Sequence, residues 1–319
     1  MKNVITAIVI ITFSTSVLSS GGRYRGTPYF DNNDRDPGCG ASPPMQILSR
    51  IVNGDQPNTN EFPWHASLYK QNTLNGTKEF RCGATIIHKK FLVTAAHCVA
   101  GDNNSSKYYV ATGNIFRDYD LSLHDPTIVK KAEVKNIYIA CNYTGYEGNF
   151  FRDIAVLEIM EPFVFSNTLV PICLDVTTHM LQLKVGDYGK VAGFGRTSTE
   201  TRSSTLQSIQ VPYRPISDCR SEGIKYQTTR FITSDKFCAG YTNGTSICDG
   251  DSGGGLVFKR NGVWYLGGIV SVSLHATLQN GVIVCDSNTL SLYTNVSQYM
   301  SWIQDIIHKT ETHKPIPTC

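Results

Sequence analysis

The chain has 319 residues, of which 41% are hydrophobic and 17% are charged, and its formal net charge is +3. A chain of this length and apolar content can bury a sizeable core, so we expect a globular protein with one large or two small domains. The basic residues are scattered apart from short pairs such as Lys89-Lys90. This pattern excludes the clustered basic patch that is typical of proteins that bind nucleic acid.

Residues 1–20 have the composition of a secretory signal peptide. Lys2 precedes a short apolar run, and small residues follow, with cleavage expected between Ser19 and Gly22. The alternatives are a buried first strand or a membrane anchor, but the run is shorter than the ~18–20 apolar residues that cross a bilayer. We therefore expect a secreted, extracellular protein without a membrane anchor.

The ten cysteines agree with an oxidising compartment, where they pair as disulfides. A metal site is the alternative, but the sequence contains no Cys-x-x-Cys or His-x-x-x-His spacing, so we expect neither a metal nor another cofactor. Asn-x-Ser/Thr sequons also fit secretion, although we do not expect both members of the adjacent pair to be occupied. The expected glycosylation sites are Asn75, Asn103, Asn104, Asn142, Asn243 and Asn295.

Residues 21–50 are rich in Gly, Pro, Asn and Arg and predict an extended leader that carries one cysteine, Cys39. From residue 51 onward, turn residues separate short apolar stretches such as "FLVTAAHC", "DIAVLEI", "GKVAGFG" and "VWYLGGIVSVS". Many short β-branched strands indicate an all-β sandwich or barrel. Near the C-terminal end, helical spacing predicts one amphipathic helix built on Tyr299, Trp302, Ile303, Ile306 and Ile307.

The stretch "ICDGDSGGGL" surrounds Ser252 with glycines and aspartates. Such clusters usually form turns, because glycine adopts positive φ without strain and Asp or Ser satisfies nearby backbone groups. The other interpretation is that Ser252 is a nucleophile. A serine nucleophile needs a base to take its hydroxyl proton, because an alcohol is almost un-ionised at neutral pH.

A histidine, with a reference pKa near ~6.5, suits the role of that base. The stretch "VTAAHC" places His97 where an apolar strand ends, although a packed histidine is the alternative interpretation. Asp153 opens the apolar strand "DIAVLEI", where poor solvation demands a partner, and a strand-initiating turn is its alternative. We expect structural or surface roles, in polar or turn-like surroundings, for His65, His88, His124, His179, His275, His308 and His313.

The segments "TAAHC", "DIAVL" and "GDSGG", in the order His, Asp, Ser, resemble the chymotrypsin-like serine protease family. The resemblance implies an all-β fold of two packed six-stranded antiparallel β-barrels with a C-terminal α-helix. It implies that Ser252 is the nucleophile, that His97 is the general base and that Asp153 orients the imidazole ring. The backbone N–H groups of Gly250 and Ser252 would form the oxyanion hole, where losing one donor typically costs about 3–4 kcal/mol.

The stretch "LSRIVNG" resembles the activation site of this family, with cleavage after Arg50 and a new N-terminus at Ile51. The new α-ammonium can insert into a pocket and pair with the carboxylate of Asp251. Burial of both charges costs several kcal/mol unless they pair, so we expect insertion to be coupled to formation of the oxyanion turn. Residues 21–50 are then the activation leader, or light chain, and residues 51–319 the serine protease domain.

The family pattern also implies a set of disulfides, each of which stabilises the fold by roughly 2–4 kcal/mol. The expected pairs are Cys82–Cys98, Cys219–Cys238, Cys248–Cys285 and Cys39–Cys173, and the last would tether the cleaved leader. Cys141 and Cys319 remain. We expect them to pair and pin the C-terminal tail, with an intermolecular bond or free thiols as the alternatives.

Trypsin-like members carry an aspartate at the floor of the specificity pocket, and Ser246 stands at that position. Without this counter-ion, the pocket favours an apolar substrate residue. Ser273 and Ser291 stand where glycines are common and should narrow the pocket. Val272 replaces a usual tryptophan, which should weaken the binding of upstream substrate residues. The backbone from Ser271 to Ser273 can still pair with an extended peptide. The expected substrate-binding residues are Ser246, Ile247, Ser271, Val272, Ser273 and Ser291.

Gly255 replaces the proline that usually completes the serine motif. Together with the lone cysteine of "CGASP", the stretch "GDSGGG" resembles the catalytic region of insect modular serine proteases, which initiate immune cascades. We therefore expect a glycosylated endopeptidase zymogen that acts on protein or peptide substrates in an immune cascade or a venom. A trypsin-like protease would activate it and serpin-type inhibitors would restrain it. The alternative is a catalytically inactive homologue that acts as a binding or cofactor protein.

Overall fold

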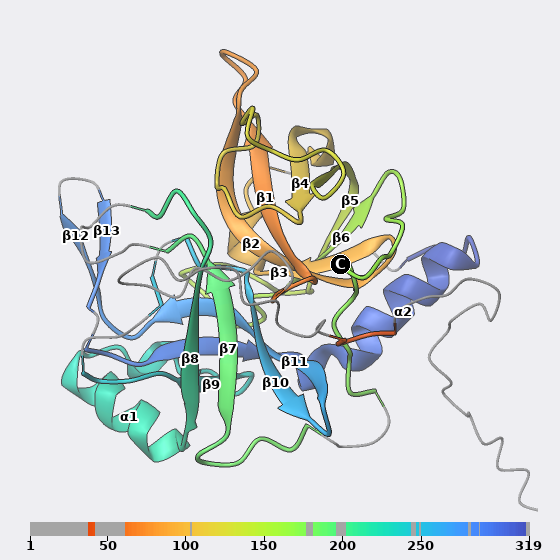
Figure 1. Cartoon of the computed structure of the whole chain (residues 1–319). Coiled ribbons are helices and arrows are strands. Elements are labelled where there is room, and N and C mark those ends of the chain that lie inside the picture. The colour runs from red at the N-terminus through yellow and green to blue at the C-terminus, as the bar shows by residue number, and fades with distance from the viewer. Residues whose placement is uncertain are drawn as a thin grey trace, which may run out of the picture.

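The computed structural model describes residues 38–41, 61–102, 104–176, 181–195, 202–243, 247–248, 250–279, 282–286 and 288–316. Within these residues the chain forms two closed six-stranded antiparallel barrels and one small two-stranded sheet. The first barrel lies above the second in Figure 1. The prediction of an all-β fold of two six-stranded barrels is thus confirmed.

The first barrel follows the strand order β1-β2-β3-β6-β5-β4. Alternate residues of each strand point inward, so the interior fills with aliphatic side chains such as Leu68, Ile86 and Leu157, which are fully buried. The strands are β1 (His65–Gln71), β2 (Lys78–His88), β3 (Phe91–Thr94), β4 (Tyr108–Thr112), β5 (Lys130–Ile139) and β6 (Ala155–Ile159).

The second barrel follows the order β10-β11-β14-β9-β8-β7 and has its own apolar interior around Phe258 and Tyr293. A hairpin of β12 (Ala276–Gln279) and β13 (Val282–Cys285) projects from the end of β11. The barrel strands are β7 (Tyr188–Gly193), β8 (Gln207–Arg214), β9 (Lys236–Ala239), β10 (Gly255–Arg260), β11 (Val263–Ser273) and β14 (Ser291–Asn295).

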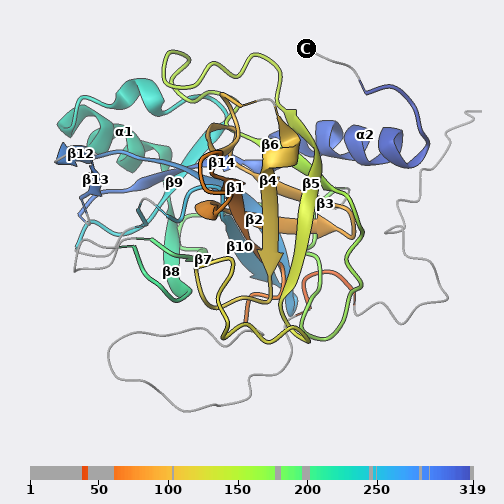
Figure 2. The ribbon, with the colours of Figure 1, turned by 90° about the horizontal axis from the view of Figure 1, so that it is seen from above.

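The predicted C-terminal helix is α2 (Met300–Glu311), which buries Ile303 and Ile306 in a core cluster shared by both barrels. A second helix, α1 (Ile216–Lys225), was not predicted. Only Cys219 and Gly223 of α1 are buried, so the helix has almost no apolar periodicity to reveal it. The two helices lie at opposite ends of the molecule in both views (Figures 1 and 2).

Short 3₁₀ turns join several of these elements. They are η1 (Ala96–Cys98), η2 (Ser105–Lys107), η3 (Thr229–Phe231) and η4 (Val296–Tyr299). The turn η1 matters most for the site, because it follows β3 directly and carries His97. None of the described helices has the length and apolar character that a membrane-spanning helix needs.

Disulfides join Cys82 to Cys98 and Cys219 to Cys238, as expected from the family pattern. A third disulfide, also expected, joins Cys39 to Cys173 and ties residues 38–41 of the predicted leader to the rest of the chain. Cys141 and Cys248 are also disulfide-bonded. Their expected partners fall outside the described part, which contains neither Cys319 nor the side chain of Cys285, so these two pairings stay predictions.

Candidate active site

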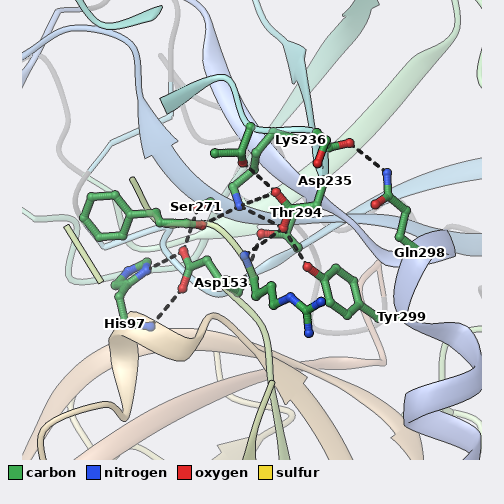
Figure 3. Close-up of polar contacts among 12 residues, drawn as sticks. His97, Asp153, Asp235, Lys236, Ser271, Thr294, Gln298 and Tyr299 are labelled. Atoms are coloured by element: carbon green, nitrogen blue, oxygen red, sulfur yellow. Dashed lines mark hydrogen bonds and ion pairs between the residues drawn. The ribbon is translucent and has the colours of Figure 1, made fainter. Parts of the chain in front are cut away.

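His97 and Asp153 lie beside the ends of two neighbouring strands of the first barrel. His97 lies on η1 just after β3, and Asp153 lies just before β6, which pairs with β3 through Thr94 and Ala155. The backbone amide of His97 donates to Asp153 Oδ1 at 2.9 Å, and ring Nδ1 lies 2.8 Å from Asp153 Oδ2 (Figure 3). Because a carboxylate only accepts, Nδ1 carries the hydrogen and Nε2 is left as the basic nitrogen.

Asp153 is fully buried and is held from the second barrel as well. Ser271 Oγ donates to Asp153 Oδ2 at 2.6 Å, and Thr294 Oγ1 donates to the Asp153 carbonyl at 2.9 Å. Burial opposes ionisation of this carboxyl, but His97, Ser271 and Lys236 outweigh burial and hold its pKa below the usual value. The site therefore contains a buried carboxylate that orients an imidazole.

Ser252 lies, half-buried, on the turn that leads into β10 of the second barrel. Its carbonyl accepts a hydrogen bond from Gly83 of β2 at 2.8 Å, and the next amide, Gly253, donates to Val270 of β11 at 2.9 Å. A Cβ added to Gly253 would lie 2.3 Å from Thr94 Oγ1. The turn thus fits tightly against the end of β3, three residues before His97, and both barrels fix its backbone.

Asp251 precedes Ser252 and is buried. Its carboxylate accepts hydrogen bonds from the backbone amides of Gly195, at 2.8 Å, and Cys248, at 3.0 Å. Gly250, predicted to donate to an oxyanion, adopts a φ of 106° on the same turn. The proposed activation residues Arg50 and Ile51 lie outside the described residues.

The residues expected to bind substrate lie mainly on β11 and β14. Ser273 pairs directly with Ser291 across these strands, and Val272 pairs with Leu292. Ile247 is buried in the core cluster of the second barrel, while Ser246 lies outside the described residues. Ser271 was expected to contribute its backbone to substrate pairing, and its side chain has the additional role of binding Asp153.

The described sequons are accessible. Asn75, Asn104, Asn142 and Asn243 are exposed and Asn295 is partly exposed, whereas Asn103 lies outside the described residues. In three of them the asparagine Oδ1 accepts from the hydroxyl two residues later, at 2.6 Å for Asn75, 2.6 Å for Asn104 and 2.7 Å for Asn295. Glycosylation of these residues stays a prediction.

One group of potential metal ligands includes His97. Its ligand atoms, with those of Cys82 and Cys98, lie within 4.8 Å of one another. The two sulfurs are bonded to each other, however, so this group offers no thiolate and only one imidazole. The cluster fits a disulfide beside a histidine better than it fits a metal centre.

Sequence reasoning missed a buried ion pair behind Asp153, formed by Asp235 and Lys236. An Asp-Lys pair immediately before the apolar stretch "FCAG" was the available signal. The expectation of polar or turn-like surroundings for His65 was wrong. His65 is buried beside Phe194, its Nε2 has no hydrogen-bond partner, and burial lowers its pKa to about 4. The apolar residues on both sides, Trp64 and Ala66, indicated this burial.

Comparison with known proteins gives a consistent result. The family model described as Trypsin matches residues 51–303. CLIP domain-containing serine protease B4 of Anopheles gambiae is 29% identical over 304 residues, which cover 92% of this chain and 78% of that protein. Vitamin K-dependent protein C of Rattus norvegicus is 31% identical over 281 residues, or 86% of this chain and 55% of that protein.

A third relative is Limulus clotting factor C of Carcinoscorpius rotundicauda, 31% identical over 271 residues, which cover 81% of this chain. The matched part spans only 25% of that clotting factor and about half of the rat protein. The shared part is therefore the protease domain. The match to the Trypsin model over most of the chain, together with these protease relatives, shows that the chain belongs to the trypsin family and is a serine-type endopeptidase.

Proposed function

We propose that this protein is a secreted zymogen that, once cleaved after Arg50, hydrolyses peptide bonds with Ser252 as nucleophile. The observation that carries the proposal is the two-point contact between buried Asp153 and His97. This contact makes Nε2 the basic nitrogen of His97, and the Ser252 turn packs against Thr94 at the end of β3, the strand that precedes η1 and His97.

In the proposed reaction, Ser252 Oγ attacks the scissile carbonyl while His97 Nε2 takes the hydroxyl proton. The resulting imidazolium is stabilised by the ionised Asp153. Collapse of the tetrahedral intermediate breaks the peptide C–N bond, and His97 gives its proton to the leaving amine. Water then repeats the sequence on the acyl-enzyme and releases Ser252. The amides of Gly250 and Ser252 are the proposed donors to the oxyanion.

Activation is proposed to work through the new α-ammonium of Ile51. Asp251 already accepts two backbone amides, so an inserted ammonium would pair with a carboxylate that also shapes the serine turn. Pairing raises the pKa of the ammonium above its reference of about 7.7–8. The active form is then intact below that raised pKa and is lost as the pH rises through it. A rate profile that stays flat to about pH 11 would refute this coupling.

The proposed specificity is for an apolar residue before the cut. Ser246 supplies no counter-ion for a basic side chain. Ser273 and Ser291, which pair across β11 and β14, are proposed to narrow the specificity pocket. Because the activation site ends in Arg50, a different, trypsin-like enzyme is the proposed activator. The similarity to proteins named CLIP domain-containing serine protease and clotting factor C supports a proposed role in an extracellular cascade. Serpin-type inhibitors are the proposed restraint on the enzyme.

The deciding experiment uses the full chain, cleaved after Arg50 by a trypsin-like protease. We expect a fluorophosphonate probe to label the cleaved form, and a peptide library to show cleavage after apolar residues. Ser252→Ala is the matched control and should take no label, and Arg50→Gln should remain an inert zymogen. Correctly cleaved protein that takes no label would instead support an inactive homologue that acts as a binding or cofactor protein.

A further inference from the structure

A buried ion pair lies behind the candidate catalytic residues. Asp235 and Lys236, at the start of β9, have side chains that are only 1% and 0% exposed, and Lys236 Nζ lies 3.4 Å from Asp235 Oδ2. Figure 3 shows both residues on the side of Asp153 that faces away from His97. Buried ion pairs are costly unless further hydrogen bonds complete them, so the partners of this pair indicate what it does.

The ion pair binds the backbone of the segment that leads to Asp153. Lys236 Nζ donates to the Phe150 carbonyl at 2.7 Å. Asp235 Oδ2 accepts from the Arg152 amide at 2.9 Å and from the Tyr299 hydroxyl at 2.7 Å. The two members of the pair therefore hold the segment at two points just before Asp153.

This segment has an unusual backbone. Asn149, Phe150 and Arg152 adopt φ angles of 56°, 56° and 63°, in the left-handed region that side chains other than glycine rarely occupy. Such strain persists only where the surrounding structure holds it, and it is concentrated at functional sites. The contacts to Lys236 and Asp235 supply that constraint.

The strained segment also reaches the other side of the site. The Phe150 ring packs edge-on against the His97 ring, with centroids 6.1 Å apart. Lys236 is, in addition, a cation whose field favours the ionised form of Asp153. The same lysine is thus connected to His97 through backbone geometry and to Asp153 through charge.

We propose that Lys236 is a positioning residue for peptide hydrolysis. Its ammonium holds the strained segment at Phe150 and, together with Asp235, sets the electrostatic field in which Asp153 and His97 work. This inference rests on the proposed function, because it assumes that His97 is the base. Lys236 itself is fully buried and acts only through these neighbours.

Other charged and titratable groups face the same cluster: Arg152, Tyr143 and Tyr299. Burial raises the pKa of both phenols, so neither ionises where the imidazole titrates. Lys236 and Asp235 carry opposite charges, so removing one or the other changes the local charge with opposite sign.

The test measures the acid limb of kcat/KM for four variants of the cleaved enzyme. Removing a cation makes protonation of the nearby imidazole easier, so Lys236→Met should move the limb to higher pH, by about half a unit or more. Asp235→Asn leaves the cation unbalanced and should move the limb to lower pH. Lys236→Met should also lower kcat about tenfold or more through misplacement of the segment.

Lys236→Gln separates the two effects, because it keeps a donor for the Phe150 carbonyl and removes the charge. We expect the acid limb of Lys236→Gln to shift as it does in Lys236→Met, while kcat recovers most of the loss. If Lys236→Met does not fold, the shift of the acid limb in Lys236→Gln tests the same charge effect. Lys225→Met, at a lysine that is 56% exposed, is the control and should leave both quantities unchanged.

Titration with a fluorophosphonate first gives the fraction of active enzyme, so misfolded protein does not enter the comparison. The inference is overturned if the acid limb of kcat/KM does not move, or if it moves in the same direction for Lys236→Met and Asp235→Asn. Lys236 would then be a purely structural residue. Failure of the wild-type enzyme to take the label, or activity that survives Ser252→Ala, would instead overturn the proposed function.

Discussion

The Asp153 carboxylate holds His97 at two points, accepting a hydrogen bond from the backbone amide at 2.9 Å and one from ring Nδ1 at 2.8 Å. The first bond fixes the position of η1 and the second fixes the ring tautomer. Because Asp153 is fully buried, water does not compete for either bond. The orientation of His97 is thus decided before substrate arrives.

Asp153→Asn should retain the fold and lose most of the activity. An amide in this place offers a donor toward the ring, which favours the tautomer with hydrogen on Nε2 and removes the base. We expect kcat to fall by about 10⁴-fold. The measurement is kcat of the cleaved enzyme on a peptide substrate, with Asp305→Asn, at a carboxylate that is 47% exposed, as control. A loss smaller than about tenfold would contradict the assigned role of Asp153.

Local sequence patterns predict an all-β sandwich or barrel and mark Ser252, His97 and Asp153 as candidates, because strands, turns and the serine motif each depend on residues close together in the chain. The resemblance in "TAAHC", "DIAVL" and "GDSGG" then supplied the pairing of barrels. Lys236 was missed for a physical reason. Its partner is a backbone carbonyl 86 residues away, and a carbonyl belongs to every residue, so the sequence does not indicate which carbonyl Lys236 contacts.

The helix α1 was missed for a related reason. Its polar face dominates, and contacts with the rest of the second barrel support it rather than a strong apolar stripe. The burial of His65 was missed because its polar residue type was given more weight than the apolar strand around it. Polarity of a single residue is a weaker guide to burial than the pattern of its neighbours.

Gly255 and Thr85 should be coupled. Gly255 opens β10 where relatives are expected to carry proline, and a Cβ at this position would lie 2.5 Å from Thr85 Oγ1. Gly255→Ala should therefore lower the free energy of unfolding by about 1–3 kcal/mol through overpacking. Thr85→Ala removes the colliding hydroxyl and should recover part of that loss in the double variant.

Equilibrium urea unfolding of the four proteins in this double-mutant cycle tests the coupling. A Ser252→Ala background prevents self-digestion during the measurement. We expect a coupling energy of at least about 0.5 kcal/mol in the stabilising direction. Strictly additive effects would mean that the chain accommodates the extra methyl by a different movement, such as displacement of Leu266.

His65 should make the protein sensitive to acid. Its pKa is about 4 in the folded protein because of burial, against 6.5 in the unfolded chain. Between pH 4 and pH 6.5 the unfolded state binds one more proton than the folded state does. The contribution of the neutral ring to the free energy of unfolding is therefore fully present above pH 6.5 and declines as the pH falls towards 4. The full loss corresponds to about 3 kcal/mol.

The measurement compares free energies of unfolding at pH 7 and pH 4.5 for the parent and for His65→Leu. The variant should lose less stability on acidification than the parent does. His308→Leu, at an exposed histidine, is the matched control and should follow the parent. Equal losses in the parent and in His65→Leu would show that the buried ring finds a partner when it is protonated.

The leader disulfide should stabilise the uncleaved chain far more than the cleaved one. Cys39 and Cys173 are 134 positions apart, so their bond closes a long loop that contains Arg50. Closing such a loop restricts the unfolded chain, and removing the bond by Cys39→Ser with Cys173→Ser should cost the uncleaved protein about 2–5 kcal/mol. Cleavage after Arg50 opens the loop, because the disulfide then links two separate polypeptides and no longer closes a ring.

After cleavage, the same double substitution should have only a small effect on the free energy of unfolding, measured in urea for cleaved and uncleaved protein. It should also release the leader, since without the disulfide the described residues 38–41 keep two backbone hydrogen bonds of Gly40, with Pro171 and Trp264. Non-reducing electrophoresis checks the release. An equal loss of stability in both forms would mean that the bond acts through packing in the folded state and not through the unfolded chain.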